Sequence, residues 1–80
     1  MGAIFMNLNE FFGNHLCKLR NEIGLTQKQV ANELNISVST YANWEQGRRE
    51  PNLYHLFELA KIFEVDMNEL FDCNFIDSTK

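Results

Sequence analysis

Apolar residues along this chain recur at spacings of three and four, which is the period of one face of an α-helix. In the first predicted helix, from about Leu8 to Ile23, the stripe consists of Phe12, Leu16, Leu19 and Ile23. Four later segments show similar spacing, and only short breaks separate the five. The pattern predicts an all-α protein built from five helices.

The predicted helices carry start and stop signals. Asn7 or Asn9 can cap the first helix, and Gly24 ends it. Three pairs have the spacing of a capping box, in which two side chains bond each other's backbone N–H groups at a helix start. These pairs are Asn7 with Glu10, Thr26 with Gln29, and Asp66 with Glu69.

The other boundaries follow from single caps. The second helix ends at Asn35, the third runs from Val38 to about Gln46 after the cap Ser37, and the fourth follows the cap Asn52. The predicted inner faces are Val30, Ala31 and Leu34 in the second helix, Leu53, Leu56, Phe57, Ala60 and Phe63 in the fourth, and Met67, Leu70 and Phe71 in the fifth.

The length of 80 residues predicts a single domain over 1–80. We expect its core to span about 8–72, with the ends 1–7 and 74–80 either flexible or engaged in dimer contacts. Residues 1–6 lack the basic residues and the long apolar core of a secretory signal. No apolar run approaches the ~20 residues that span a bilayer. These features predict a cytoplasmic protein without a membrane partner.

Composition gives little support to catalysis or metal binding. Cys17 and Cys73 are far apart, and neither they nor His15 and His55 have metal-ligand spacing. The carboxylates form no recognisable cleft motif, and no phosphate loop or nucleophile signature is present. We therefore predict no enzymatic activity, no cofactor and no metal, and two reduced thiols.

The net charge of −4 argues against a nucleic-acid ligand unless the charge is unevenly distributed. Up to Glu50, five cations balance five acids, whereas from Pro51 onward two cations face six acids. The whole acidic surplus therefore belongs to the C-terminal part. The first fifty residues remain free to hold a polyanion.

The second and third helices, joined by a four-residue break, form a helix-turn-helix candidate. Tyr41 and Trp44 are the large apolar residues of the third helix besides Val38, and they share one side, so we expect them to face the core. The opposite side is uncharged and carries Ser39, Ala42, Asn43 and Gln46, with Val38 and Thr40 at its flanks. Hydroxyls, amides and methyl groups are the groups that pair with base edges in the major groove.

Candidate phosphate ligands surround this side. Gln27 and Lys28 lie at the start of the second helix, where free N–H groups and the helix dipole favour an anion. Arg48 and Arg49 follow the third helix and can contact the DNA backbone. Thr40 either contributes a backbone contact or serves only the helix cap.

Three stretches resemble the phage repressor/Cro (Xre-like) helix-turn-helix family, in its order and at its spacing. They are LTQKQVA at 25–31, ISVSTY at 36–41 and WEQGRREP at 44–51, within a resemblance that covers about 14–71. The resemblance implies a five-helix lambda-repressor-like domain whose third helix enters the major groove of double-stranded DNA.

The resemblance also implies roles for individual residues. Gln27 would contact a phosphate or an outer base, and Val38, Ser39 and Asn43 would read bases. Family members often pair an arginine of the first helix with a glutamate of the third, so Arg20 and Glu45 would form a structural pair; Tyr41 and Trp44, which face the core by their spacing, are structural residues as well. Two positions depart from the family, because Asn35 and Glu64 stand where it usually has glycine.

The function predicted from these observations is a sequence-specific transcriptional regulator, a small repressor acting at an inverted repeat. A prophage regulator, an antitoxin autorepressor and a restriction–modification controller, which can also activate, remain open. A competing class is a protein-interaction module of this fold that has lost DNA affinity. Apolar residues near both ends predict a homodimer through the fifth helix and its flanks: Ile4, Phe5, Met6, Leu8, Phe11, Phe12, Leu70, Phe71, Phe75 and Ile76.

Overall fold

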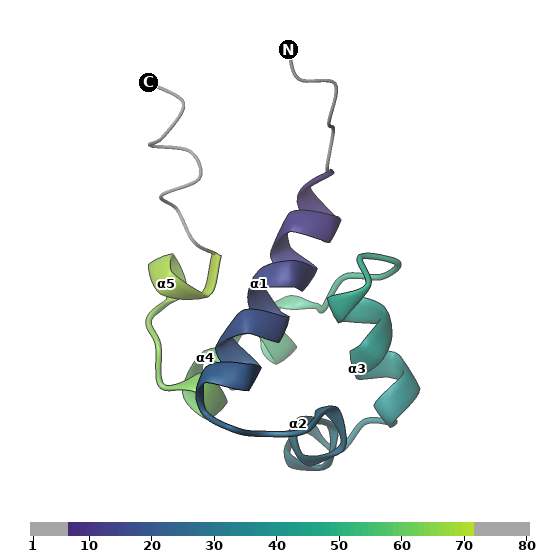
Figure 1. The fold of residues 1–80 in the computed structure, drawn as a ribbon, viewed down its shortest axis with the longest axis vertical. Coiled ribbons are helices and arrows are strands. Elements are labelled where there is room, and N and C mark those ends of the chain that lie inside the picture. The colour runs from purple at the N-terminus through teal and green to yellow at the C-terminus, as the bar shows by residue number, and fades with distance from the viewer. Residues whose placement is uncertain (1–6, 72–80) are drawn as a thin grey trace.

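All five predicted helices are present in the computed structural model, which describes residues 7–71 (Figure 1). That range contains no strand. The helices are α1 Leu8–Glu22, α2 Gln27–Leu34, α3 Val38–Glu45, α4 Leu53–Phe63 and α5 Met67–Phe71. The all-α fold and the order of its elements are confirmed. The apolar residues expected at 1–6 and 72–80 lie outside the described range.

The helix starts use the caps that the sequence predicts. At α1 the cap is Asn7 rather than Asn9, with Glu10 N donating to Asn7 Oδ1 at 2.8 Å and Asn7 N donating to Glu10 Oε1 at 3.2 Å. The Thr26–Gln29 and Asp66–Glu69 capping boxes are also formed. Each box satisfies backbone donors that a helix start leaves without an internal partner.

Two helices end in a left-handed residue that is not glycine. Asn35 after α2 and Glu64 after α4 both have φ of 59°. In each case the next N–H reaches back over the last turn, from Ile36 to the Ala31 carbonyl and from Val65 to the Ala60 carbonyl, each at 3.0 Å. This is the bonding pattern of a glycine-terminated helix. Both departures from the family pattern are therefore accommodated in the backbone.

Each helix contributes one fully buried large side chain to a single core. These residues are Leu16, Val30, Tyr41, Leu59 and Leu70. α3 packs against both α1 and α2, while α5 packs against α1 and α4. The helix that carries the candidate base-reading residues is thus held by two neighbours, which gives its outward side a defined orientation.

The predicted inner faces need corrections in three helices. In α5, Phe71 is 40% exposed although its ring stacks on Phe12. Ile23 is 44% exposed, because α1 ends at Glu22 and the chain turns away at Gly24. In α4, Leu53 and Phe57 are 66% and 53% exposed. The residues of α4 that pack inward are instead Leu56, Leu59, Ala60, Ile62 and Phe63. Leu56, Ala60 and Phe63 of the predicted stripe do face inward, but apolar residues occur around most of this helix, so periodicity alone does not exclude Leu53 and Phe57.

α5 is attached to α1 by an aromatic pair and a polar contact. The rings of Phe12 and Phe71 stack with centroids 5.3 Å apart. His15 Nε2 lies 2.6 Å from the carbonyl oxygen of Glu69. The start of α1 and the end of α5 consequently lie at the same end of the molecule (Figure 1).

Candidate nucleic-acid interface

The inward side of α3 is anchored by aromatic packing. Tyr41 is fully buried and Trp44 is 4% exposed, and their rings meet edge to face with centroids 5.8 Å apart. Trp44 also contacts the ring of His55 on α4, at 5.2 Å between centroids. The predicted inward orientation of Tyr41 and Trp44 is confirmed. Trp44 is not available to stack on a base.

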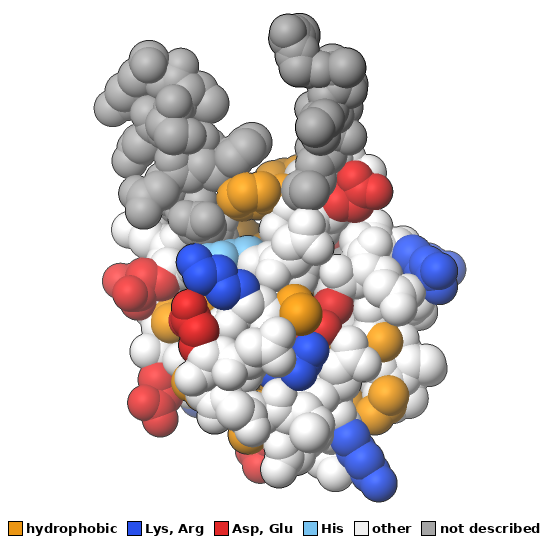
Figure 2. Space-filling model, in the orientation of Figure 1, with side chains coloured by type: hydrophobic (Ala, Val, Ile, Leu, Met, Phe, Trp, Pro, Cys, Tyr) orange, Lys and Arg blue, Asp and Glu red, His pale blue; other side chains and the backbone are white. Residues whose placement is uncertain are grey.

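The outward side of α3 is accessible and uncharged. Val38, Ser39 and Thr40 are exposed, and Asn43 is half-buried with Ala42 beside it. In Figure 2 the surface over α3, at the right of the view, is white and orange, with Lys and Arg side chains above and below it. The structure therefore brings the three predicted base-reading residues together on one face between cations.

The first turn of α3 is held by hydroxyl groups. Ser37 Oγ accepts a hydrogen bond from Thr40 N at 3.1 Å and shares a hydrogen bond with Thr40 Oγ1 at 2.8 Å. It also lies 3.2 Å from Ser39 Oγ. Thr40 thus serves the cap while remaining exposed. A hydroxyl that donates in one bond keeps acceptor capacity for another, so the cap does not exhaust these groups.

The loop after α3 folds back onto the helix. The backbone N–H groups of Arg48 and Arg49 both donate to the carbonyl oxygen of Asn43, at 3.0 and 3.4 Å. Gly47, with φ of 77°, allows the reversal. Both arginine side chains are exposed. The backbone of both arginines is consequently held beside Asn43, a predicted base-reading residue.

A buried ion pair joins α1 to the end of α3. Arg20 Nε donates to Glu45 Oε2 at 2.7 Å, and Arg20 Nη2 donates to Glu45 Oε1 at 3.1 Å. Arg20 Nη1 also donates to the carbonyl oxygen of Leu25, at 2.9 Å, in the turn before α2. The predicted pairing of Arg20 with Glu45 is present. It connects three segments of the helix-turn-helix scaffold.

The same carboxylate holds Gln27, a contact that the sequence pattern did not indicate. Gln27 Nε2 donates to Glu45 Oε1 at 2.8 Å. Gln27 is half-buried at the first position of α2, whereas its neighbour Lys28 is exposed. The two predicted phosphate ligands of α2 therefore differ, because one is held by a buried carboxylate and the other extends into solvent.

The contacts around Glu45 shift the pKa values of Glu45, Arg20 and Tyr41. Burial alone would raise the pKa of Glu45, but Arg20 first, and then the nearby Tyr41 hydroxyl and the Gln27 amide, outweigh it and lower that pKa. The bond to Glu45 raises the pKa of Arg20 further above its ordinary value. Burial, followed by the proximity of Glu45, raises the pKa of Tyr41, whose buried hydroxyl has no hydrogen-bond partner of regular geometry. Glu45 is therefore an anion at neutral pH.

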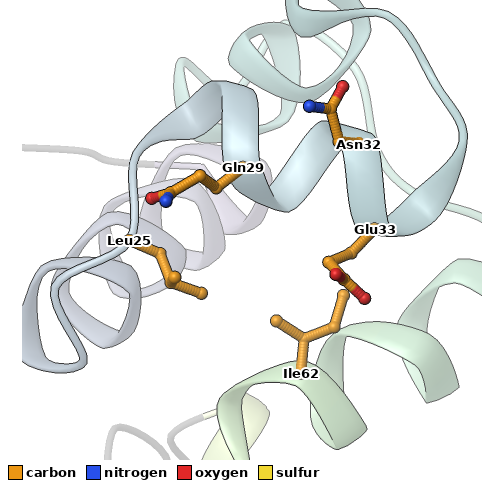
Figure 3. A pocket seen from close by; sticks show the side chains of 5 residues that line it. All are labelled: Leu25, Gln29, Asn32, Glu33 and Ile62. Atoms are coloured by element: carbon orange, nitrogen blue, oxygen red, sulfur yellow. The ribbon is translucent and has the colours of Figure 1, made fainter.

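A shallow hollow lies between α2 and α4, away from α3. Its lining combines two amides, one carboxylate and two aliphatic side chains: Leu25, Gln29, Asn32, Glu33 and Ile62 (Figure 3). Glu33 is the single titratable group in this lining. The hollow offers no acid–base pair and no nucleophile, and none of its residues belongs to the candidate interface.

Residues 7–71 give little support to a metal site or a membrane span. Over residues 7–71 no group of three or more His, Cys, Asp or Glu side chains is arranged to bind a metal ion. None of the helices α1 to α5 is long and apolar enough to span a membrane. Cys17 is a half-buried free thiol, and Cys73 lies outside the described residues.

The region of this chain that matches a known protein family includes the helix-turn-helix. A family model described as Helix-turn-helix matches residues 18–70. An uncharacterized HTH-type transcriptional regulator, y4dJ of Sinorhizobium fredii, is 35% identical over 65 residues, covering 81% of this chain and 84% of that protein.

Two further relatives are longer proteins with opposite named effects. The transcriptional activator BcrR of Enterococcus faecalis is 37% identical over 59 residues, or 74% of this chain and 29% of BcrR. The cryptic phage CTXphi transcriptional repressor RstR of Vibrio cholerae is 34% identical over 55 residues, or 69% of this chain and 49% of RstR. This chain thus spans half or less of their lengths.

Solved structures show the same fold. The restriction-modification controller protein C.AhdI from Aeromonas hydrophila aligns with a TM-score of 0.71 at 30% identity, over 76% of this chain and 92% of that one. The DNA-binding domain of BldD aligns with a TM-score of 0.70 at 23% identity, over 84% and 97% of the two chains. At that identity the second likeness concerns the fold alone.

Proposed function

The chain belongs to the phage repressor/Cro (Xre-like) helix-turn-helix family of DNA-binding transcriptional regulators, and we propose that it is a dimeric repressor that binds an inverted-repeat operator. The observation that carries this proposal is the uncharged outward side of α3, bounded by cations at both ends. Such a face can enter the major groove while the flanking cations meet the two phosphate backbones.

Sequence preference would come from α3. The amide of Asn43 suits the donor and acceptor pair of adenine, and the hydroxyl of Ser39 can meet several bases. The methyl groups of Val38, which is exposed at the first position of α3, suit a thymine methyl. These three residues would therefore read bases.

Affinity and register would come from groups around that face. Lys28 at the start of α2 and Arg48 and Arg49 after α3 are exposed cations that can neutralise phosphates. Gln27 and Thr40 can add neutral hydrogen bonds at the same edges. The five residues would position the protein without specifying sequence. Because its ligand is DNA, we also propose a cytoplasmic location.

We place the dimer interface on α5 and the apolar ends. In the described range, Leu8 at the start of α1 is 73% exposed, and Phe71 remains 40% exposed although it stacks on Phe12. A contiguous exposed apolar surface commonly marks an interface. Two copies joined there would present two α3 helices to one duplex, which suits an inverted repeat.

Another exposed apolar group offers the competing interface. Leu53, Tyr54 and Phe57 lie on one side of α4 and are all more than half exposed. The two surfaces lie on different helices, so substitutions can separate them.

Repression is favoured over activation by the relative named as a phage repressor. A repressor needs only to occupy a site that overlaps a promoter. The match covers 49% of that repressor and only 29% of the named activator BcrR, so the activator's effect transfers less directly to this chain.

Selection from a random duplex library tests the function, followed by binding to the enriched sequence at several salt concentrations. We expect an inverted repeat to be enriched. The logarithm of affinity should fall with the logarithm of salt concentration by about 0.9 per neutralised phosphate. Absence of enrichment together with salt-independent binding would contradict DNA reading and favour the protein-interaction module.

A further inference from the structure

We propose that Glu45 is a positioning residue for DNA binding, which orients the Gln27 amide so that a phosphate meets its N–H group. The inference rests on the proposed function. Glu45 is buried at the end of α3 and does not itself face the solvent. Its influence on DNA would pass through the 2.8 Å hydrogen bond from Gln27 Nε2.

The chemistry of the pair selects one orientation of the amide. An ionised carboxylate can only accept hydrogen bonds, whereas an amide has a donating and an accepting end. Glu45 therefore attracts the Nε2 end of Gln27 and repels the carbonyl end. One N–H bond is committed to the carboxylate, and the second N–H bond of the same nitrogen remains for another acceptor. A phosphate oxygen is such an acceptor.

Arg20 keeps the Glu45 carboxylate ionised and in position to hold the Gln27 amide. It donates to both oxygens of Glu45, at 2.7 and 3.1 Å, and its third donor is held by the Leu25 carbonyl. Glu45 Oε1 accepts from both Arg20 and Gln27, so the ion pair and the amide share one atom. The ion pair thus fixes the point from which the Gln27 side chain is held.

Preorganisation has a measurable consequence for affinity. A free glutamine side chain must be ordered when it binds a phosphate, and that ordering weakens the complex. Holding the amide in advance removes part of this cost. A residue that acts only through Gln27 should therefore matter for DNA binding when Gln27 is present and cease to matter when it is absent.

The test is a double-mutant cycle on affinity for the selected duplex, with Gln27→Ala, Glu45→Gln and the double variant. The isosteric amide at position 45 can donate as well as accept, so it no longer selects one orientation of Gln27. We expect each single variant to bind about fivefold to tenfold more weakly, and Glu45→Gln to cost less than about twofold in the Gln27→Ala background.

Lys28→Ala supplies the matched control background. Lys28 is the next residue in the chain and is exposed, whereas the side chains that bond Glu45 are Arg20 and Gln27, so Glu45→Gln should cost the same affinity there as in the wild type. Affinities are corrected for the folded fraction, measured by circular dichroism. Equal losses in the wild-type and Gln27→Ala backgrounds would overturn the proposal, as would a Gln27→Ala variant that binds normally.

A measurement on the wild-type protein covers the case in which Glu45→Gln does not fold. Nitrogen relaxation of the side-chain amides should show Gln27 to be restricted and the exposed Gln46 to be mobile in the DNA-free protein. Equal mobility of the two amides would overturn the proposal. Failure of the wild type to bind any duplex would instead reject the proposed function, so the two failures are distinguishable.

Discussion

Gly13 in the middle of α1 lies directly against the backbone of Trp44 at the end of α3. A Cβ atom at position 13 would come within 2.5 Å of the Trp44 carbonyl oxygen and within 2.5 Å of the Glu45 carbonyl oxygen. Both obstacles are backbone atoms, which cannot rotate away. The close approach of α1 and α3 therefore depends on the missing side chain.

Gly13→Ala should consequently destabilise the domain although alanine favours helix formation. We expect a loss of about 3 kcal/mol in the free energy of unfolding, at the upper end of ordinary overpacking effects, and weaker DNA binding because α3 must shift. Urea unfolding checks the first expectation. Gly24→Ala is the control, since open space surrounds Gly24 and only its positive φ opposes a side chain, at about 1 kcal/mol. Equal costs for the two variants would contradict the packing explanation.

Asn43 and Arg48 should differ in how their loss affects different DNA sequences. Asn43→Ala should cost about 1–3 kcal/mol on the selected duplex and relax the preference at one base position. Arg48→Ala should weaken binding to all duplexes similarly and reduce the salt dependence by about one phosphate. Binding to a panel of single-base operator variants measures both effects. A uniform loss for Asn43→Ala would remove it from the base-reading residues.

The oligomeric state should respond to Leu8 and not to Phe57. Leu8→Glu places a charge in the proposed interface, yet an acid in the first turn suits the dipole of α1, so the fold should be retained. We expect this variant to be a monomer at a concentration where the wild type is a dimer, as measured by size exclusion with light scattering. Phe57→Glu likewise replaces an exposed apolar side chain by a carboxylate, on α4, and should leave the dimer intact.

The reverse result, with Phe57→Glu monomeric and Leu8→Glu dimeric, would place the interface on α4. A wild-type protein that is monomeric at high micromolar concentration would exclude the dimer altogether.

Acid should weaken the fold in part through Glu45. Burial opposes ionisation, but Arg20, Tyr41 and Gln27 together prevail and hold the folded-state pKa of Glu45 below the ordinary value of 4.5. A lowered pKa contributes stability that is complete above the unfolded-state value and is lost as the pH falls through the folded-state value. Between about pH 6 and pH 3 the free energy of unfolding should therefore fall more steeply in the wild type than in Glu45→Gln. Parallel pH profiles would show that Glu45 does not contribute.

The end of α4 offers a stabilising substitution. Glu64 adopts a left-handed conformation that a side chain disfavours by about 1 kcal/mol, so Glu64→Gly should raise the melting temperature by roughly 4–8 °C. Asn35→Gly, at the same φ of 59°, is the control and should gain less, since asparagine enters this region more readily. A melting temperature unchanged or lowered by Glu64→Gly would show that the carboxylate side chain has a compensating role.

Local chemistry made the helices and most of the candidate interface predictable. Capping boxes and left-handed stops act within a few residues, so Thr26, Asn35 and Ser37 mark helix ends wherever the helices later pack. The side of α3 was predictable as well. Tyr41 and Trp44 outweigh every other apolar group on that helix, so one direction had to be inward.

The face of α4 was not predictable in the same way. Apolar residues surround most of this helix, and several orientations would bury a similar amount of apolar surface. The contacts with α2 and α5 select the side that carries Leu59 and leave Phe57 exposed. The importance of Gly13 was equally hidden, since a glycine within a helix shows its purpose only when the opposing backbone is in place.

By itself, then, the sequence determined where each helix begins and ends and which side of α3 turns outward, because these depend on neighbours along the chain and on one dominant pair of aromatic rings. Only the tertiary structure decided that Gln27 would be held by Glu45, eighteen residues further along. Hydrogen bonds between distant segments depend on how the helices pack, and that packing balances contributions from the whole core at once.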